Sequence, residues 1–83
     1  MALILFAETE GELAPHDALA LDISAHGLRI QAGAPLTPGQ VVEVFPVEGN
    51  EPFRARVVWV GKPASEVESQ AGLEFLDPFD VST

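Results

Sequence analysis

Three residues of this 83-residue chain are of types that could bind a nucleobase: Asp22, Ser24 and Gly27. If residues 19–23 form an extended strand that continues to the next residue, positions 22 and 24 share one face, so the carboxylate and the hydroxyl are neighbours. A carboxylate accepts hydrogen bonds from ring N–H and amino groups, and a glycine lets the backbone approach a ligand without a Cβ in the way. This set of groups fits the donor-rich edge of guanine.

The same three residues also fit a purely structural interpretation. Asp22 would lie opposite Arg29 across a hairpin, where a cross-strand ion pair contributes at most about 1 kcal/mol. Ser24 can hydrogen-bond to nearby backbone, and Gly27 can take the positive φ that a tight reversal requires. Both interpretations place a hairpin turn at residues 24–27, and the bare pattern fits either of them.

The residues on either side of this turn alternate as the two arms of a hairpin would. Leu19, Leu21 and Ile23 are predicted to point into the core, which leaves the polar residues between them on the opposite face. After the turn, Leu28 and Ile30 are predicted to continue the inward face. The hairpin therefore presents its polar residues together on the outside.

A second hairpin is predicted for residues 41–47 and 53–60. A two-residue Gly-Asn loop would fix its register and place Glu43 opposite Arg56. In that register the inward face is apolar and consists of Val42, Val44, Phe53, Ala55, Val57 and Trp59. Trp59 is the largest apolar side chain, so its burial is expected to dominate this part of the core.

The segments between these strands have the composition of turns. Residues 8–17 contain four carboxylates and are predicted to be a solvated loop. Pro38–Gly39 suits the centre of a type II turn, because proline fixes φ at the first position and glycine supplies a positive φ at the second. Residues 61–69 are again loop-like, and residues 70–76 are predicted to form the last strand.

The first strand, residues 2–8, is apolar on both faces, so its alternation does not identify the side that meets the core. Ile4 and Phe6 either are covered by the rest of the chain or form an exposed patch. In the second case we expect a homodimer that forms through these two residues.

About six short strands, separated by Gly/Pro-rich turns, predict an all-β fold in one domain that covers residues 1–83. Closing the sheet into a barrel removes the edge strands, whose unpaired backbone groups would otherwise promote aggregation of so small a domain. Composition alone does not say which kind of barrel forms.

The pattern Asp22-x-Ser24-x-x-Gly27, between an outgoing and a returning strand, resembles the signature of the PilZ family, a small β-barrel module of bacteria. Residues 57–60 and 71–78 are similar to that family's last two strands, so the likeness covers most of the chain. The resemblance implies a six-stranded antiparallel Greek-key barrel. It also implies a site for the bacterial second messenger cyclic di-GMP at these three residues, and a regulatory role in signalling, motility or surface regulation.

The family's other half-site is an N-terminal Arg-x-x-x-Arg arm that stacks on guanine and grips phosphate, and residues 1–21 contain no arginine. Without that arm, the two phosphates of the ligand meet a chain of net charge −9. We therefore expect that cyclic di-GMP binding is weak or lost, with Arg29 as the phosphate contact. The alternative is a domain that keeps the barrel and works through contacts with an unidentified protein.

Composition and motifs argue against several other functions. Thirteen acidic and four basic residues oppose binding to DNA, RNA or an anionic membrane. With no cysteine and two histidines, neither a metal nor a cofactor is expected, and no nucleophile motif surrounds the serines, so we expect no enzymatic activity. The apolar start of the chain lacks a basic region and is far shorter than the ~20 residues of a membrane-spanning helix, so the cytoplasm is the expected location.

Overall fold

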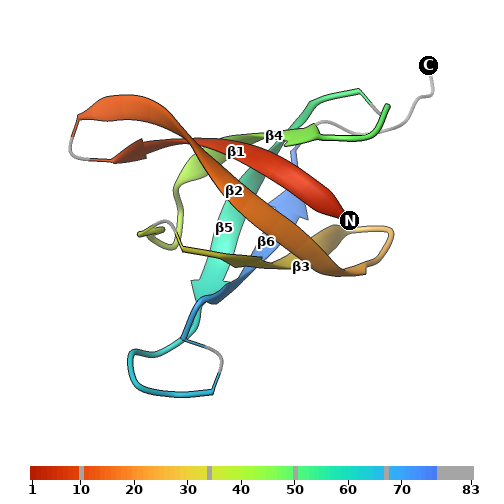
Figure 1. Cartoon of the computed structure of the whole chain (residues 1–83). Coiled ribbons are helices and arrows are strands. Elements are labelled where there is room, and N and C mark those ends of the chain that lie inside the picture. The colour runs from red at the N-terminus through yellow and green to blue at the C-terminus, as the bar shows by residue number, and fades with distance from the viewer. Residues whose placement is uncertain (10, 34, 50, 67, 77–83) are drawn as a thin grey trace.

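The computed structural model describes residues 1–9, 11–33, 35–49, 51–66 and 68–76, and in it six antiparallel strands close into a barrel (Figure 1). In chain order the strands are β1 (Ala2–Thr9), β2 (Glu12–Ile23), β3 (Gly27–Ala32), β4 (Val41–Pro46), β5 (Phe53–Val60) and β6 (Gln70–Phe75). Around the barrel they lie in the order β1-β2-β3-β6-β5-β4, and β4 pairs with β1 to close it. Strands β4, β5 and β6 follow one another, whereas β3 lies beside β6, which is a Greek-key arrangement. The predicted all-β Greek-key barrel is confirmed.

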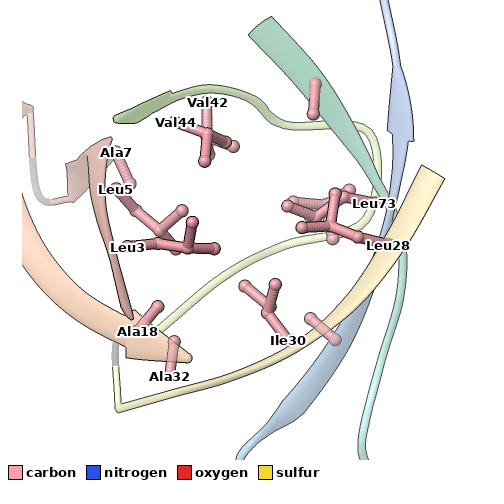
Figure 2. Packing of buried hydrophobic residues seen from close by; sticks show 13 residues of the cluster. Leu3, Leu5, Ala7, Ala18, Leu28, Ile30, Ala32, Val42, Val44 and Leu73 are labelled. Carbon is pink, nitrogen blue, oxygen red and sulfur yellow. The ribbon is translucent and has the colours of Figure 1, made fainter. Parts of the chain in front are cut away.

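The interior is filled by aliphatic side chains from all six strands (Figure 2). The largest fully buried ones are Leu3, Leu5, Ile30, Val42, Val44 and Val57. Alternation predicted the inward faces of β3 and β4 correctly. On β1 the structure identifies the side that meets the core. Leu3 and Leu5 point inward, whereas Ile4 and Phe6 are half-buried on the outside. Among the described residues no helix could span a membrane.

Strand β2 does not present the predicted face to the core. The three residues expected inside are exposed by 49%, 37% and 57%: Leu19, Leu21 and Ile23. Instead Ala18 is buried and Ala20 packs against the core. The pairing of β2 with β3 has a β-bulge between Ala20 and Asp22, so Leu21 has no partner on β3. The residues of β2 before and after this bulge therefore alternate between the two faces of the sheet in different phases. Leu3 lies opposite Ala18, so a large side chain of β1 meets a small one of β2.

The segment at residues 8–17 is mostly strand, so the prediction of a solvated loop there was wrong. β1 continues to Thr9 and β2 starts at Glu12, and the two strands pair along the whole length of β1. Gly11 has a φ of 83°, which permits the tight reversal. Figure 1 shows this hairpin extending past the neighbouring strands. Its end is exposed to solvent, so carboxylates are tolerated within strand structure.

The two strands of the β4–β5 hairpin have nearly the predicted limits, but they pair in a different register from the predicted one. Glu43 lies opposite Arg54 rather than Arg56, and Val44 lies opposite Phe53. The two strands end and begin at Pro46 and Phe53, so the connection is longer than a two-residue loop; Asn50 of the expected loop lies outside the described residues. Because the register differs by two residues, the inward face of β4 is unchanged.

Trp59 is not part of the core, contrary to the prediction. A second bulge, between Val57 and Trp59, shifts the phase of β5 against β6. The indole is 39% exposed and lies over Gly72 of β6. A Cβ on Gly72 would lie 2.1 Å from the indole Nε1, so only glycine leaves room for the ring at this position.

The predicted turn at Pro38–Gly39 is confirmed. Gly39 has a φ of 94°, and the N–H of Gln40 donates to the carbonyl oxygen of Thr37 at 3.0 Å. The side chain of Gln40 in turn donates to the carbonyl oxygen of Glu8 at 2.9 Å, so the connection between β3 and β4 is tied to β1.

Candidate ligand site

An open hollow with a volume of about 530 Å³ lies at the β2–β3 turn and the adjoining parts of β5 and β6. All four residues predicted as ligand contacts line it: Asp22, Ser24, Gly27 and Arg29. Trp59 of β5 lines it as well. The fold therefore brings together the residues that the spacing of the motif selected, and adds an aromatic ring from a distant strand.

The turn itself is held by a compact set of hydrogen bonds. The N–H of Ser24 donates to the carbonyl oxygen of Gly27 at 2.8 Å, and the N–H of His26 donates to the Ser24 Oγ at 3.3 Å. From the neighbouring strand, the N–H of Phe75 donates to the carbonyl oxygen of His26 at 2.9 Å. Ser24 thus shapes the turn, as the structural interpretation predicts, and β6 fixes the turn against the barrel wall.

Asp22 and Arg29 form the cross-strand ion pair that their predicted positions suggested. The register places them opposite each other, and the Arg29 Nη2 and Nε donate to the Asp22 Oδ2 at 2.5 and 3.2 Å. The Arg29 Nη1 also donates to the Gln70 Oε1 at 2.9 Å. Both charged side chains are open to solvent, so their pairing contributes at most about 1 kcal/mol. A ligand could therefore displace this ion pair at little cost.

Gly27 is required for a reason other than the one expected. Its φ is not among the positive values of the chain, so the prediction of a left-handed conformation was wrong. Gly27 is buried, and a Cβ at this position would lie 2.0 Å from the carbonyl oxygen of Leu73. The close approach of β6 excludes a side chain here, so Gly27 positions the turn by letting two strands meet.

Trp59 is the residue at this hollow that the sequence analysis missed, because simple alternation placed it inside the barrel. A signal for its true position was present in the sequence. Gly72 lies in the interior of a strand, where a glycine often marks the close approach of another group. That group is the indole of Trp59, which lies over Gly72 and lines the hollow on the β5 side.

The other two arginines on the outer face do not line the hollow. Arg56 pairs with Glu74, whose Oε2 lies 3.0 Å from the Arg56 Nη1, so the expectation that Glu43 pairs with Arg56 was wrong. Arg54 lies opposite Glu43 in the β4–β5 register. Glu74 itself lines the hollow, so the site combines carboxylates with one arginine and an aromatic ring. Among the described residues no cluster of histidine and acidic side chains could hold a metal ion.

The family model described as "PilZ domain" matches residues 3–83, which is nearly the whole chain. No curated protein and no solved structure matches.

Proposed function

Because the chain belongs to the PilZ domain family, we propose that it is a non-catalytic regulatory module of the bacterial cytoplasm that binds cyclic di-GMP weakly. The observation that supports this proposal is the shared hollow. The motif residues, Arg29 and the Trp59 ring line a single open space of about 530 Å³, which is large enough for part of a dinucleotide.

Each group at the hollow has a chemical role in this proposal. The Asp22 carboxylate accepts hydrogen bonds from the ring N–H and amino group of a guanine, and the Ser24 hydroxyl adds a second polar contact. The exposed face of the Trp59 indole offers a surface on which a base can stack. Arg29 donates to a phosphate, and its hydrogen bond to Gln70 keeps the guanidinium at the site when it leaves Asp22.

Weak binding follows from charge. The ligand brings two negative charges to a chain of net charge −9, and residues 1–21 supply no arginine to meet them. Two missing charge-assisted contacts, at ~1.5 to 3 kcal/mol each, weaken binding at least a hundredfold relative to a family member that has both. We therefore expect a dissociation constant above a micromolar.

Calorimetry of the chain with cyclic di-GMP tests the proposal. Asp22→Ala should weaken binding at least tenfold, whereas Asp17→Ala, which removes an exposed carboxylate of β2 away from the hollow, should leave binding unchanged. Trp59 is the only tryptophan, so its fluorescence should change with the same titration curve. A dissociation constant below a micromolar, or weak binding that Asp22→Ala does not alter, would contradict the proposal.

A module that acts through protein contacts alone is the second candidate function. The observation in its favour is that Asp22 and Arg29 already form an ion pair with each other in the absence of a ligand. Apolar side chains also stand exposed around the hollow, with Ile23 at 57% and Val58 at 53% exposure. No heat and no change in Trp59 fluorescence at millimolar cyclic di-GMP would favour this second function.

A further inference from the structure

The outer side of β1, away from the hollow, carries an apolar surface that the proposed ligand binding does not use. Ile4 and Phe6 point outward from this strand, and Phe45 of β4 lies directly opposite Ile4. The rings of Phe6 and Phe45 meet edge to face, with 5.1 Å between their centroids. All three side chains are half-buried, so they form the partly covered centre of this apolar surface.

Exposed apolar side chains extend this centre along the barrel. Leu13 and Leu19 of β2 are 67% and 49% exposed, and Val47, just after β4, is 57% exposed. Leu19 lies opposite Ala2, and the N–H of Val47 donates to the carbonyl oxygen of Ala2, so both residues flank the start of β1. We call the outward residues of β1 with these neighbours on β2 and β4 the β1 face. Exposed apolar side chains gathered on one side of a small domain are typical of an interaction site.

Carboxylates are set among these apolar side chains. Glu8 lies opposite Leu13, Asp17 opposite Ile4, and Glu43 opposite Phe6. Neither β1 nor β2 contains a lysine or an arginine, and Arg54, across from Glu43, is the nearest basic residue in the strand register. The β1 face therefore combines an apolar centre with negative charge on both sides.

The strand edge beside this face is a poor site for adding another strand. Residues 12–17 of β2 pair with β1 but not with β3, which joins β2 only from Ala18 onward. Pro15 lies in the middle of that edge and has no N–H to donate. A partner is therefore expected to dock on the side chains of the face rather than on the backbone of the edge.

We propose that the β1 face docks a partner protein through a basic amphipathic segment. Apolar side chains of that segment cover Ile4, Phe6 and Phe45, and its lysines or arginines meet Glu8, Asp17 and Glu43. Charge complementarity selects this partner. A second copy of the chain, the partner predicted from the sequence, would place like carboxylates against each other and adds its own net charge of −9.

A synthetic peptide tests the proposal. The probe is an 18-residue fluorescent helix with leucines on one face and lysines on the other, titrated with the 83-residue chain and followed by anisotropy. Its counterpart carries glutamates in place of lysines. The lysine peptide is expected to bind at least tenfold more tightly than the glutamate peptide, with amide shifts in ¹⁵N spectra confined to β1, β2 and β4. Absence of binding, or shifts that cluster elsewhere, would overturn the proposal.

Matched charge variants separate docking on the β1 face from general attraction between a cation and an acidic protein. The double variant Glu8→Lys, Asp17→Lys should weaken binding of the lysine peptide at least tenfold. The control Glu66→Lys, Glu68→Lys makes the same change of charge at exposed positions of the loop between β5 and β6, and should alter binding less than twofold. Equal weakening by the two variants would show that only net charge matters, and would overturn the proposal.

The oligomeric state completes the test. Sedimentation equilibrium of the chain alone at ~100 µM is expected to give the mass of one chain. Leu19→Ser removes an exposed apolar side chain of the β1 face and should weaken peptide binding at least threefold. A dimer that this variant dissociates would assign the face to a second copy of the chain and overturn the proposed basic partner.

Discussion

At Gly27 the wall of the barrel leaves no space for a side chain. A Cβ there would lie 2.0 Å from the carbonyl oxygen of Leu73 and 3.0 Å from the Cα of Glu74, and both are backbone atoms that cannot rotate away. Gly27→Ala should therefore force β3 and β6 apart and lower the free energy of unfolding by about 1 to 3 kcal/mol, the usual cost of overpacking. Urea denaturation measures this loss.

Gly33→Ala is the matched control, because a Cβ on Gly33 would meet no atom within 4 Å and its φ is not positive. The backbone change is the same, but no contact is created, so stability should stay the same or rise by a few tenths of a kcal/mol. If both variants unfold at the same urea concentration, the close approach of β6 to Gly27 is not as described.

Among single residues, the sequence selected side chains that the structure brings together, although the reason it gave for Gly27 was wrong. Asp22, Ser24 and Arg29 were found because a period-2 alternation and a short turn relate them locally, and the structure places all of them at one hollow. The role of Gly27 depends on Leu73, which is distant in the chain, so no local pattern could reveal it. The ion pair of Asp22 with Arg29 needed only the hairpin, and it was predicted.

Among the elements, the paired strands β5 and β6 also meet where the Trp59 ring of β5 lies on the backbone of Gly72. A Cβ on Gly72 would lie 2.1 Å from the Trp59 Nε1 and 2.6 Å from its Cδ1, so Gly72→Ala should push the indole off β6. Trp59 is the only tryptophan, so its emission should move to longer wavelength and acrylamide should quench it more strongly. Unchanged emission and quenching in this variant, as expected for Gly33→Ala, would contradict the contact.

The limits of β4, β5 and β6 were predicted to within a residue, whereas the start of β2 and several strand faces were not. Strand β5 occupies the predicted residues, Phe53–Val60, because turn residues flank a β-branched and aromatic run. The predicted faces failed on β2, at Leu19, Leu21 and Ile23, and on β5, at Trp59, and each of these strands contains a bulge. A bulge adds one residue to a strand without a distinctive composition, so a single alternation cannot fit the residues on both sides of it. The β4–β5 register also depended on a loop length that composition did not define.

For the molecule as a whole, surplus negative charge is the dominant electrostatic feature. The two ion pairs with described geometry, Arg29–Asp22 and Arg56–Glu74, lie on the surface and contribute at most about 1 kcal/mol each. The Cα radius of gyration is 12.2 Å, so most carboxylates of the folded chain lie within one Debye length of each other at ~0.01 M salt, where that length is ~30 Å. Repulsion between them destabilises the compact state.

Salt should therefore stabilise the folded barrel. Raising NaCl from ~0.01 to ~0.3 M screens repulsion more than it screens the short ion pairs, because the repelling charges are farther apart. We expect a gain of about 1 kcal/mol, which corresponds to a rise in Tm of ~4 to 8 °C for a domain of this size, measured by circular dichroism. The variant Glu66→Lys, Glu68→Lys replaces a negative charge by a positive one at each position and so changes the net charge from −9 to −5, and its Tm should rise less with salt. A Tm that falls as salt is added would mean that attractive pairs outweigh the surplus of carboxylates.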